Sequence, residues 1–366
     1  MPDHAPPPPP APPFPGSLSP GSSPLDLFDV AIVGAGPAGL FAAFQCRMLR
    51  LSCVLLDVLS ETGGQCAALY PEKPIFDIPA HPAIEAGTLV SRLEEQLAPF
   101  AVPRLLGRRV DSLSGGPGAF SLGTDRGDRV RCRAVIVAAG AGAFGPNRPP
   151  LPELDRFERS GAVQYYVRRR ADFAGRRVAI AGGGDSAVDW ALFLAPVAAK
   201  VWLVHRRDRF RAAPESLERL RTAEAAGQVE RVVPFQLSAL RGDADGILHG
   251  LVVSDLDAAE RVLDADRLLP CFGLSTELGP LSGWELATTG DRGPIPVDAA
   301  TLRTARPGVF AIGDVCSYPG KLKLISQGFS EAAMVAHALH AVCRPGEALH
   351  FEHSTTAGLP LDAVPA

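Results

Sequence analysis

The pattern of hydrophobic positions predicts two copies of one strand–turn–helix unit. The first copy is "DVAIVGAGPAGLFAAF", in which an apolar, β-branched run precedes glycines and then a helical pattern. The second copy is "VAIAGGGDSAVDWALFLA", which starts at Val178. Each copy is followed by a further apolar strand, "SCVLLD" after the first and "AKVWLVHRR" after the second. Strand, helix and strand in this order form the βαβ unit of nucleotide-binding folds.

Later segments predict how the two units are arranged along the chain. Two segments, 133–154 and 264–281, each read as a strand followed by a Gly- or Pro-rich stretch that could connect two domains. A strand, a loop and a long helix then follow in 304–343. We therefore predict an α/β protein with two Rossmann-like dinucleotide-binding domains, in which the second domain is inserted into a discontinuous first domain. The expected order is a Pro-rich tail (1–24), the first domain (25–151 and 271–345), the inserted domain (152–270) and a C-terminal tail (346–366).

The first glycine loop, "GAGPAG", is typical of a dinucleotide site. Gly34 permits a tight turn, Gly36 lets the main chain approach a pyrophosphate, and Gly39 lets the helix pack closely on the strand. Pro37 lies at the helix start, whose N-terminus faces phosphate charge. The next strand ends at Asp57, a carboxylate that can accept hydrogen bonds from ribose hydroxyls. The alternative is an ordinary βαβ unit with a glycine-rich turn.

The second glycine loop has the same spacing but the opposite charge after its second strand. Gly182, Gly184 and Ala187 give GxGxxA, and Asp185 and Ser186 open the helix. The following strand runs into basic residues instead of an acid, and these are His205, Arg206, Arg207, Arg209 and Arg211. Arginines accept a 2′-phosphate through charge-assisted bonds, whereas an acid selects a free 2′-hydroxyl. The first loop therefore suits FAD and the second suits NADPH; the alternative for the basic run is a solvated surface.

Two dinucleotide sites in one chain indicate an oxidoreductase. NADPH can pass a hydride to flavin N5, and flavin can release electrons singly or in pairs. The chemistry needs the nicotinamide placed against the flavin more than it needs acid–base groups.

Composition narrows the function classes further. The chain has 366 residues, 46% of them hydrophobic and 21% charged, with a net charge of −4, so no overall basic field favours nucleic acid. No apolar run reaches the roughly 20 residues of a membrane span, and we expect a cytoplasmic protein.

None of the seven cysteines forms a CxxC pair, which argues against a disulfide framework or a metal site. Residues 1–24 are Pro-rich and lack the basic start and apolar core of a signal peptide, so we expect a disordered tail; an SH3-type ligand is the alternative.

Several segments resemble the two-dinucleotide-binding-domain flavoprotein reductases, and among them the thioredoxin-reductase-like ferredoxin–NADP⁺ reductases. The resemblance runs from about Phe28 to the C-terminus and is carried by "TGGQCAALYPEKPIFDIPAHP", "AGAGAFGPNRP", "GGGDSAVDWALFLAP", "AIGDVCSYPGKLKLISQGFSEA" and "HSTT". Thioredoxin reductases have a redox CxxC shortly before the second glycine loop. Here that stretch reads "AVQYYVRRRADFAGRR" and holds no cysteine, so a disulfide relay lacks its thiols.

The resemblance implies roles for particular residues. Tyr70 would stack on one face of the isoalloxazine, and His353 on the other, either within the chain or across a homodimer, with the C-terminal tail covering the flavin. The residues expected to hold FAD with Asp57 are Gln65, Val110, Phe144, Asp314 and Thr355. The family often has Glu at the position of Asp57, and the shorter acid should still reach the ribose. Without the family, Tyr70 would be taken for a core aromatic and His353 for a tail residue.

The resemblance implies electron transfer between NADPH and a ferredoxin or flavodoxin. Ferredoxins are usually acidic, so a local basic surface is expected, with Lys321, Lys323, Arg47 and Arg50 as candidates. One alternative is a related flavoenzyme that reduces a low-molecular-weight disulfide or a quinone, an option kept open by Cys66 and Cys316 beside expected flavin ligands. Another is a flavin-binding redox sensor without fast turnover, against which the intact second glycine loop counts.

Overall fold

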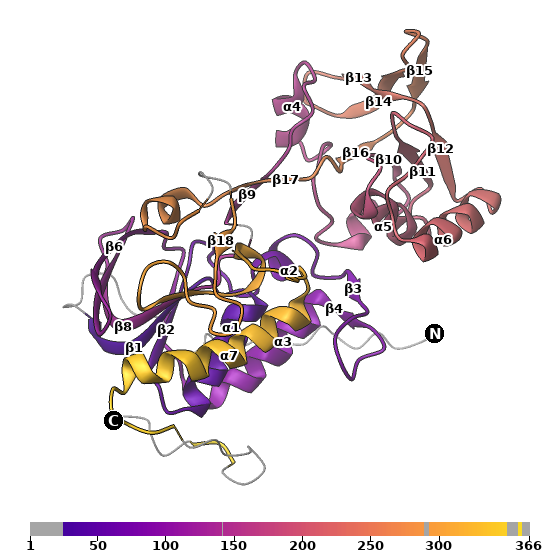
Figure 1. Ribbon diagram of the computed structural model, residues 1–366. Helices are drawn as coiled ribbons and strands as arrows, with labels where there is room; N and C mark the ends of the chain where they lie inside the picture. Colours follow the sequence, from indigo (N-terminus) through magenta and orange to yellow (C-terminus); the bar gives the residue numbers. More distant parts are fainter. Residues whose placement is uncertain (1–24, 141, 289–292, 350–357, 361–366) are drawn as a thin grey trace, which may run out of the picture. The chain divides into compact units, whose positions relative to one another are not determined.

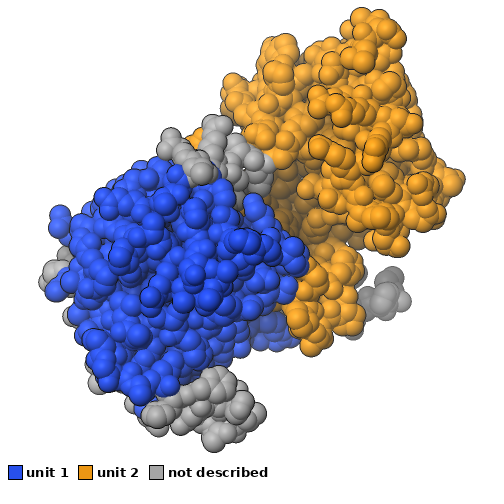
Figure 2. All heavy atoms as spheres, in the orientation of Figure 1, with its two compact units in different colours: residues 1–64, 90–140, 278–366 blue, residues 65–89, 141–277 orange. Residues whose placement is uncertain are grey.

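The computed structural model describes residues 25–140, 142–288, 293–349 and 358–360 (Figure 1). They fall into two compact units (Figure 2): unit 1 comprises 1–64, 90–140 and 278–366, and unit 2 comprises 65–89 and 141–277. Each unit contains one of the two glycine loops, as the repeated pattern predicts. Unit 2 also contains 65–89, a segment that precedes the predicted inserted domain in sequence. The tail 1–24 and most of 346–366 lie outside the described residues.

Unit 1 is built on a mostly parallel sheet in the order β5-β2-β1-β8, with β19 pairing with the end of β8. The antiparallel strands β7 and β6 extend it beyond the start of β8. The carboxyl ends of the parallel strands meet at one edge, which is where ligands bind in such sheets. The strands of this sheet are β1 (Leu25–Val33), β2 (Cys53–Asp57), β5 (Arg104–Leu106), β6 (Val110–Gly116), β7 (Ala119–Thr124), β8 (Arg129–Val137) and β19 (Val309–Ala311).

Helices cover this sheet. Helix α1 (Pro37–Met48) follows β1 and lies beside α7 (Ile325–Cys343) (Figure 1). Helix α3 (Ala86–Leu97) has its first residues assigned to unit 2 and the rest to unit 1. A short pair, β18 (Ile295–Pro296) with β20 (Cys316–Ser317), completes unit 1. The core of unit 1 consists of buried aliphatic and aromatic side chains from both before and after residues 141–277, so its sequence-distant parts fold as one body.

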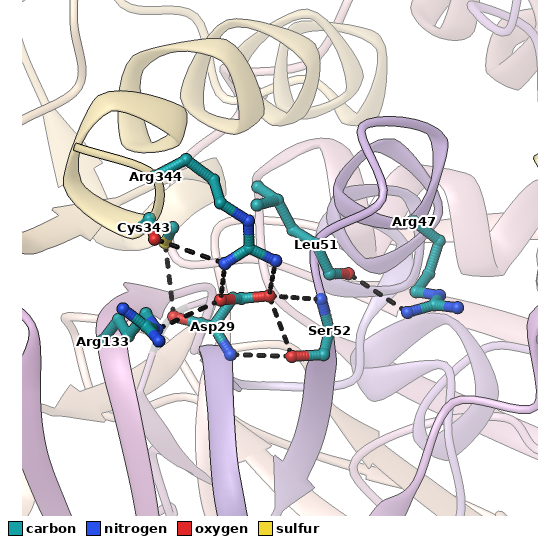
Figure 3. Close-up of polar contacts among 7 residues, drawn as sticks. All are labelled: Asp29, Arg47, Leu51, Ser52, Arg133, Cys343 and Arg344. Atoms are coloured by element: carbon teal, nitrogen blue, oxygen red, sulfur yellow. Dashed lines mark hydrogen bonds and ion pairs between the residues drawn. The ribbon is translucent and has the colours of Figure 1, made fainter. Parts of the chain in front are cut away.

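A buried carboxylate fastens the two ends of unit 1 together. Asp29 in β1 is almost fully buried and accepts hydrogen bonds from both terminal nitrogens of Arg344, which directly follows α7 (Figure 3). The same carboxylate accepts bonds from Ser52 N and Oγ, both at 2.9 Å, and Arg133 Nε lies 3.3 Å away. A buried charge with this many partners is well compensated, so the C-terminal end of α7 is fixed to the start of β1.

Unit 2 repeats the architecture with a four-stranded parallel sheet in the order β12-β11-β10-β16. Its strands are β10 (Arg177–Ala181), β11 (Lys200–Val204), β12 (Val229–Val232) and β16 (Arg267–Pro270), and its main helices are α5 (Asp185–Leu194) and α6 (Pro214–Ala225). Unit 2 also contains a separate antiparallel sheet, formed by β13 (Gln236–Gly242), β14 (Leu248–Ser254) and β15 (Glu260–Leu263). The smaller elements are α2 (Gly64–Ala68), α4 (Leu154–Arg159), β3 (Pro74–Ile75) paired with β4 (Ile84–Glu85), and β9 (Ala143–Pro146) paired with β17 (Leu274–Glu277).

Both units are therefore Rossmann-like, which confirms the predicted fold class. Among the described residues, no helix combines the length and the apolar character that crossing a membrane requires.

Candidate functional site

The first glycine loop joins β1 to α1 in the geometry expected for a phosphate site. Gly34 has φ +114°, and a Cβ there would lie 2.3 Å from Ala138 O. A Cβ on Gly39 would lie 1.9 Å from Gly34 O, so the helix packs directly on the turn. Gly36 is different, because a Cβ there would meet only Gly64 Cα, at 3.9 Å. No side chain caps α1, so its first amides are available to a ligand.

Asp57, at the end of β2, is bound to this loop. Its Oδ2 accepts the Ala35 N–H at 2.6 Å, and its Oδ1 accepts the Leu59 N–H at 2.8 Å. Burial raises the pKa of the Asp57 carboxyl, and the backbone hydrogen bonds oppose that rise. Each carboxylate oxygen can accept a further hydrogen bond, so Asp57 can hold the loop and a ribose hydroxyl together. The sequence predicts the second role but not the first.

The "TGGQ" segment also reaches the first glycine loop. Gly63 N donates to Ala35 O at 2.8 Å, and a Cβ on Gly64 would lie 3.1 Å from Gly36 Cα. Gln65 follows directly, at the second residue of α2. Neither Gly63 nor Gly64 is predicted as a site residue from the sequence, although a GG pair within a segment that resembles the family is a visible signal.

The Gly313–Asp314 turn lies against the start of α1. A Cβ on Gly313 would lie 3.5 Å from Ala38 Cβ, so the turn after β19 and the first glycine loop form one edge of unit 1. Asp314 is half-buried there. The structure thus brings together six predicted residues of unit 1, namely Gly34, Gly36, Pro37, Gly39, Asp57 and Asp314.

A buried glutamate that is not among the predicted residues holds this turn. Glu331 in α7 is 0% exposed and accepts hydrogen bonds from Gly313 N at 2.7 Å and Tyr318 Oη at 2.6 Å. Lys321 Nζ also donates to Glu331, forming a buried ion pair. The sequence does carry a signal, because Glu331 lies four residues before Val335 on the apolar stripe of the predicted helix.

Two of the four basic residues predicted for acceptor docking are wrong. The side chain of Lys321 is only 6% exposed and is paired with Glu331. Arg47 is buried, with its guanidinium over the Phe100 ring and a hydrogen bond to Leu51 O (Figure 3). Lys323 and Arg50 are exposed and stay candidates.

The second glycine loop joins β10 to α5 and is equally tight. A Cβ on Gly182 would lie 2.6 Å from Cys271 O and 3.1 Å from Ala187 Cβ. Gly184 caps α5 without a side-chain bond, and a Cβ there would find its nearest atom 4.0 Å away, so the helix start is again open. Asp185 Oδ1 accepts the Ala213 N–H at 2.9 Å, which anchors the loop that follows β11.

The basic run after β11 folds back onto the second glycine loop. Arg211 N donates to Gly183 O at 2.7 Å, and the His205 ring occupies the space where a Cβ on Gly183 would be, 2.2 Å from Nε2. Burial, followed by the charges of Arg206, Arg207 and Arg211, lowers the pKa of His205. Among the residues that the structure describes, these arginines are exposed and form no ion pair, which leaves their charge for an anion.

The remaining predicted residues are placed as follows. The side chain of Val110 is packed in the core of unit 1, so a contact with FAD would fall to its main chain. Tyr70 is half-buried in unit 2, and Phe144 lies in β9, its side chain outside the described part. His353 and Thr355 lie outside the described residues. The residues predicted for NADPH come together in unit 2, namely Gly182, Gly184, Asp185, Ser186, Ala187, His205, Arg206 and Arg207.

All seven cysteines lie among the described residues, none of them is in a disulfide, and six are buried. Burial, reinforced by Glu331, raises the pKa of Cys316 to about 12, so this thiol stays protonated. Within the described residues, no group of three or more His, Cys, Asp or Glu side chains could hold a metal ion.

The chain is similar to known proteins over most of its length. Residues 28–338 match the family model described as pyridine nucleotide-disulphide oxidoreductase. A ferredoxin–NADP reductase of Gluconacetobacter diazotrophicus is 66% identical over 332 residues, which cover 91% of this chain and 96% of the relative. One from Rhodospirillum rubrum is 55% identical over 349 residues, which cover 94% and 99%.

Solved structures share the fold at lower identity. Thioredoxin reductase from Lactococcus lactis is 24% identical with a TM-score of 0.74, and the match covers 86% of this chain and 99% of that one. Thioredoxin reductase from T. acidophilum has the same TM-score at 23% identity, with 86% and 98% covered. The chain shares its fold with the thioredoxin reductases, and it belongs to the pyridine nucleotide-disulphide oxidoreductase family together with ferredoxin–NADP reductases.

Proposed function

We propose that this chain is a ferredoxin–NADP reductase that binds FAD at its first glycine loop and NADPH at its second. The observation that carries the proposal is the contrast in charge between two otherwise similar loops. Asp57 closes the first loop, whereas His205 and three exposed arginines surround the second. Relatives at 47–66% identity over most of the chain bear the name ferredoxin–NADP reductase.

The residues of unit 1 fit FAD. The open space over Gly36 and the uncapped start of α1 suit a pyrophosphate, and Asp57 suits the adenosine ribose. Asp314 lies on the same edge, held there through Gly313 and Glu331. Gln65, Val110, Tyr70, Phe144, His353 and Thr355 stay part of the proposal on the strength of the family resemblance.

The residues of unit 2 fit NADPH in preference to NADH. The helix start at Gly184 suits its pyrophosphate, and the fold-back of Arg211 onto Gly183 brings the basic run next to that point. A 2′-phosphate there would accept charge-assisted hydrogen bonds from Arg206 and Arg207, and NADH would leave both arginines unused.

Bound FAD supplies the chemistry that links a two-electron hydride donor to a one-electron iron–sulfur acceptor. The chain's own part is to orient the two nucleotides and to exclude water from the rings. Tyr70 and His353 are the ring-stacking residues that we propose for this role. Exposed Lys323 and Arg50 are the candidates for steering an acidic ferredoxin, or a flavodoxin in its place. We further propose that the protein is cytoplasmic and forms a homodimer. Sedimentation of the purified protein would test the homodimer, and cell fractionation would test the location.

The buried thiols favour this acceptor over a small disulfide. Cys316 is 1% exposed and Cys66 is 3% exposed, so a disulfide substrate could not reach either sulfur without a rearrangement. Replacing both with serine should leave ferredoxin-dependent turnover intact.

The decisive experiment is cytochrome c reduction by the purified FAD-loaded protein, with and without ferredoxin. We expect ferredoxin to stimulate turnover strongly with NADPH and much less with NADH. Flavin that NADPH reduces without any ferredoxin effect would assign another acceptor. Flavin that NADPH does not reduce would overturn the assignment of the second glycine loop.

A further inference from the structure

A segment of unit 2 that carries no nucleotide-binding strand is attached to helix α5. Residues 65–89 leave unit 1 after Gly64 and return to it at Val90, yet they cluster with 141–277. Their strands are β3 and β4, of two residues each. So short a pair does not hold a position by itself, so contacts with the rest of unit 2 help to place this segment, in addition to α2 and α3 at its two ends.

One of these contacts is an ion pair with α5. Lys73 Nζ lies 2.8 Å from Asp189 Oδ2, and the side chains are 28% and 30% exposed. The same ammonium lies 5.6 Å from the centre of the Trp190 ring, so it is attracted by two successive residues of the helix.

Two further hydrogen bonds attach the segment to residues 168–170. Arg170 N donates to Glu72 Oε2 at 2.6 Å, and Arg168 Nε donates to Ala68 O at 3.2 Å. The charged residues of the "PEK" sequence, which is part of the segment that resembles the family, are therefore both engaged with the nucleotide-binding part of unit 2.

Tyr70 lies between these attachment points. Its carbonyl oxygen accepts the Lys73 N–H at 3.0 Å, and its ring packs against the hydrophobic core that α5 helps to form. Whatever holds Lys73 on α5 therefore also holds Tyr70.

The helix that carries Asp189 is the one that begins at the proposed pyrophosphate site. Asp185 is at its first turn, and Asp189 follows four residues later on the same face. A ligand that orders the start of α5 should therefore also order the side of the helix to which Lys73 is bound.

We propose that Lys73 and Asp189 are positioning residues that couple the Tyr70 segment to the occupancy of the NADPH site. The inference rests on the proposed function only in taking the start of α5 as the NADPH site. Because the pair is partly exposed, its effect is modest, on the order of threefold to fivefold, and it weakens as ionic strength rises.

Hydrogen–deuterium exchange of the FAD-loaded full chain, with and without NADP⁺, tests the coupling without using activity. In the unmodified protein, NADP⁺ should slow exchange in 183–190 and also in 66–75. In Asp189→Asn and Lys73→Met, the slowing in 183–190 should remain, while the slowing in 66–75 should be lost. The reversed pair, Lys73→Asp with Asp189→Lys, should regain the slowing in 66–75. Lys73→Arg alone, which keeps the positive charge, should retain it.

Glu218→Gln is the matched control, because Glu218 pairs with Arg221 at 2.5 Å on an exposed surface of α6 in the same unit. It should leave both responses unchanged. In the coupling variants, the dissociation constant of NADP⁺ should stay within about twofold, while flavin reduction by saturating NADPH slows by about threefold to fivefold.

The outcomes separate the two proposals. The coupling is overturned if NADP⁺ still slows exchange in 66–75 in both Asp189→Asn and Lys73→Met. It is also overturned if that slowing is lost in Lys73→Arg. A response confined to 183–190 in the unmodified protein overturns it as well, and leaves the NADPH site intact. No response at 183–190 in the unmodified protein overturns the NADPH assignment itself, and the coupling with it.

Discussion

The two glycine loops share their backbone geometry and differ in what closes them. In both, the third position of the motif packs on the first, and the second glycine leaves an open helix start. The residue between the first two glycines differs. Ala35 donates its N–H to Asp57, whereas the Gly183 carbonyl accepts the Arg211 N–H and the missing side chain of Gly183 makes room for the His205 ring. The Asp57 carboxylate leaves room for the methyl group of Ala35, whereas the packed His205 ring would have to move to make room for one at position 183.

In the proposed assignment, this difference separates the part of each loop that would hold a pyrophosphate from the part that would read the ribose. The shared glycines would serve a group that FAD and NADPH have in common. The residues after the second strand would serve the 2′ position, in which the two cofactors differ. Changes to the shared part should therefore remove binding, and changes to the other part should alter selectivity.

The largest effect is expected from Gly39→Ala. In a helix, alanine is normally more stable than glycine by about 0.5–1 kcal/mol. Here its Cβ would lie 1.9 Å from a main-chain oxygen, an overlap that should cost about 1–3 kcal/mol or more. We expect a lower melting temperature and a low FAD content, measured by calorimetry and by flavin absorbance.

Gly116→Ala is the control for that change. A Cβ at Gly116 would have no neighbour within 4 Å, so FAD content and melting temperature should stay as they are. Full FAD content in Gly39→Ala would show that the helix does not pack tightly on the first glycine loop. The two loops would then no longer share this close packing.

The second effect is on selectivity. Arg206→Gln combined with Arg207→Gln removes two exposed charges that form no ion pair among the residues that the structure describes. A hydrogen bond to a charged group contributes about 1.5–3 kcal/mol, so kcat/KM for NADPH should fall by about tenfold to a hundredfold. The value for NADH should hardly change, as steady-state kinetics with both nucleotides would show. Equal losses for both would mean that the arginines do not read the 2′-phosphate.

Much of the fold and of both loops could be predicted from the sequence, because the information is local. The β-branched runs, the glycine spacing and the residue that ends each second strand lie within about 30 residues of one another, which is the length of one βαβ unit. Contacts that depend on distant packing could not be predicted in this way. Glu331 meets Gly313 only because α7 packs beside α1, and nothing near Gly313 in sequence indicates it.

The same limit explains the two wrong docking candidates. Lysine and arginine are mostly exposed in proteins, and nothing near Lys321 or Arg47 in the sequence indicates that either is buried. Their positions are decided by Glu331 and Phe100, which lie 10 and 53 residues away. A long basic side chain can bury its stem and pair its charge wherever tertiary structure supplies a partner.

A smaller effect is expected from Gly183→Ala. The new methyl group would meet the His205 ring at 2.2 Å, but that ring is a side chain and can move. We expect KM for NADPH to rise by about threefold to tenfold, since the basic run is displaced without losing its charges. FAD content should be unaffected, because the change lies in unit 2, and flavin absorbance checks this. An unchanged KM would mean that the packing of His205 on Gly183 has no role in binding.

The smallest effect concerns pH. Burial and the neighbouring arginines hold the pKa of free His205 below its ordinary value of about 6.5, so the ring is neutral near pH 7. A bound 2′-phosphate adds negative charge and should raise that pKa, so binding takes up a proton. NADP⁺ should therefore bind tighter as pH falls from 8 toward 6.5, by at most about tenfold per pH unit. Below about pH 6 the phosphate itself becomes protonated and opposes the trend.

Calorimetric titration in buffers of different ionisation enthalpy measures the proton uptake. NAD⁺, which lacks the phosphate, should show no uptake. His205→Asn should abolish the uptake that accompanies NADP⁺ binding. Equal uptake for both nucleotides would assign the proton to another group and leave recognition of the 2′-phosphate to the arginines.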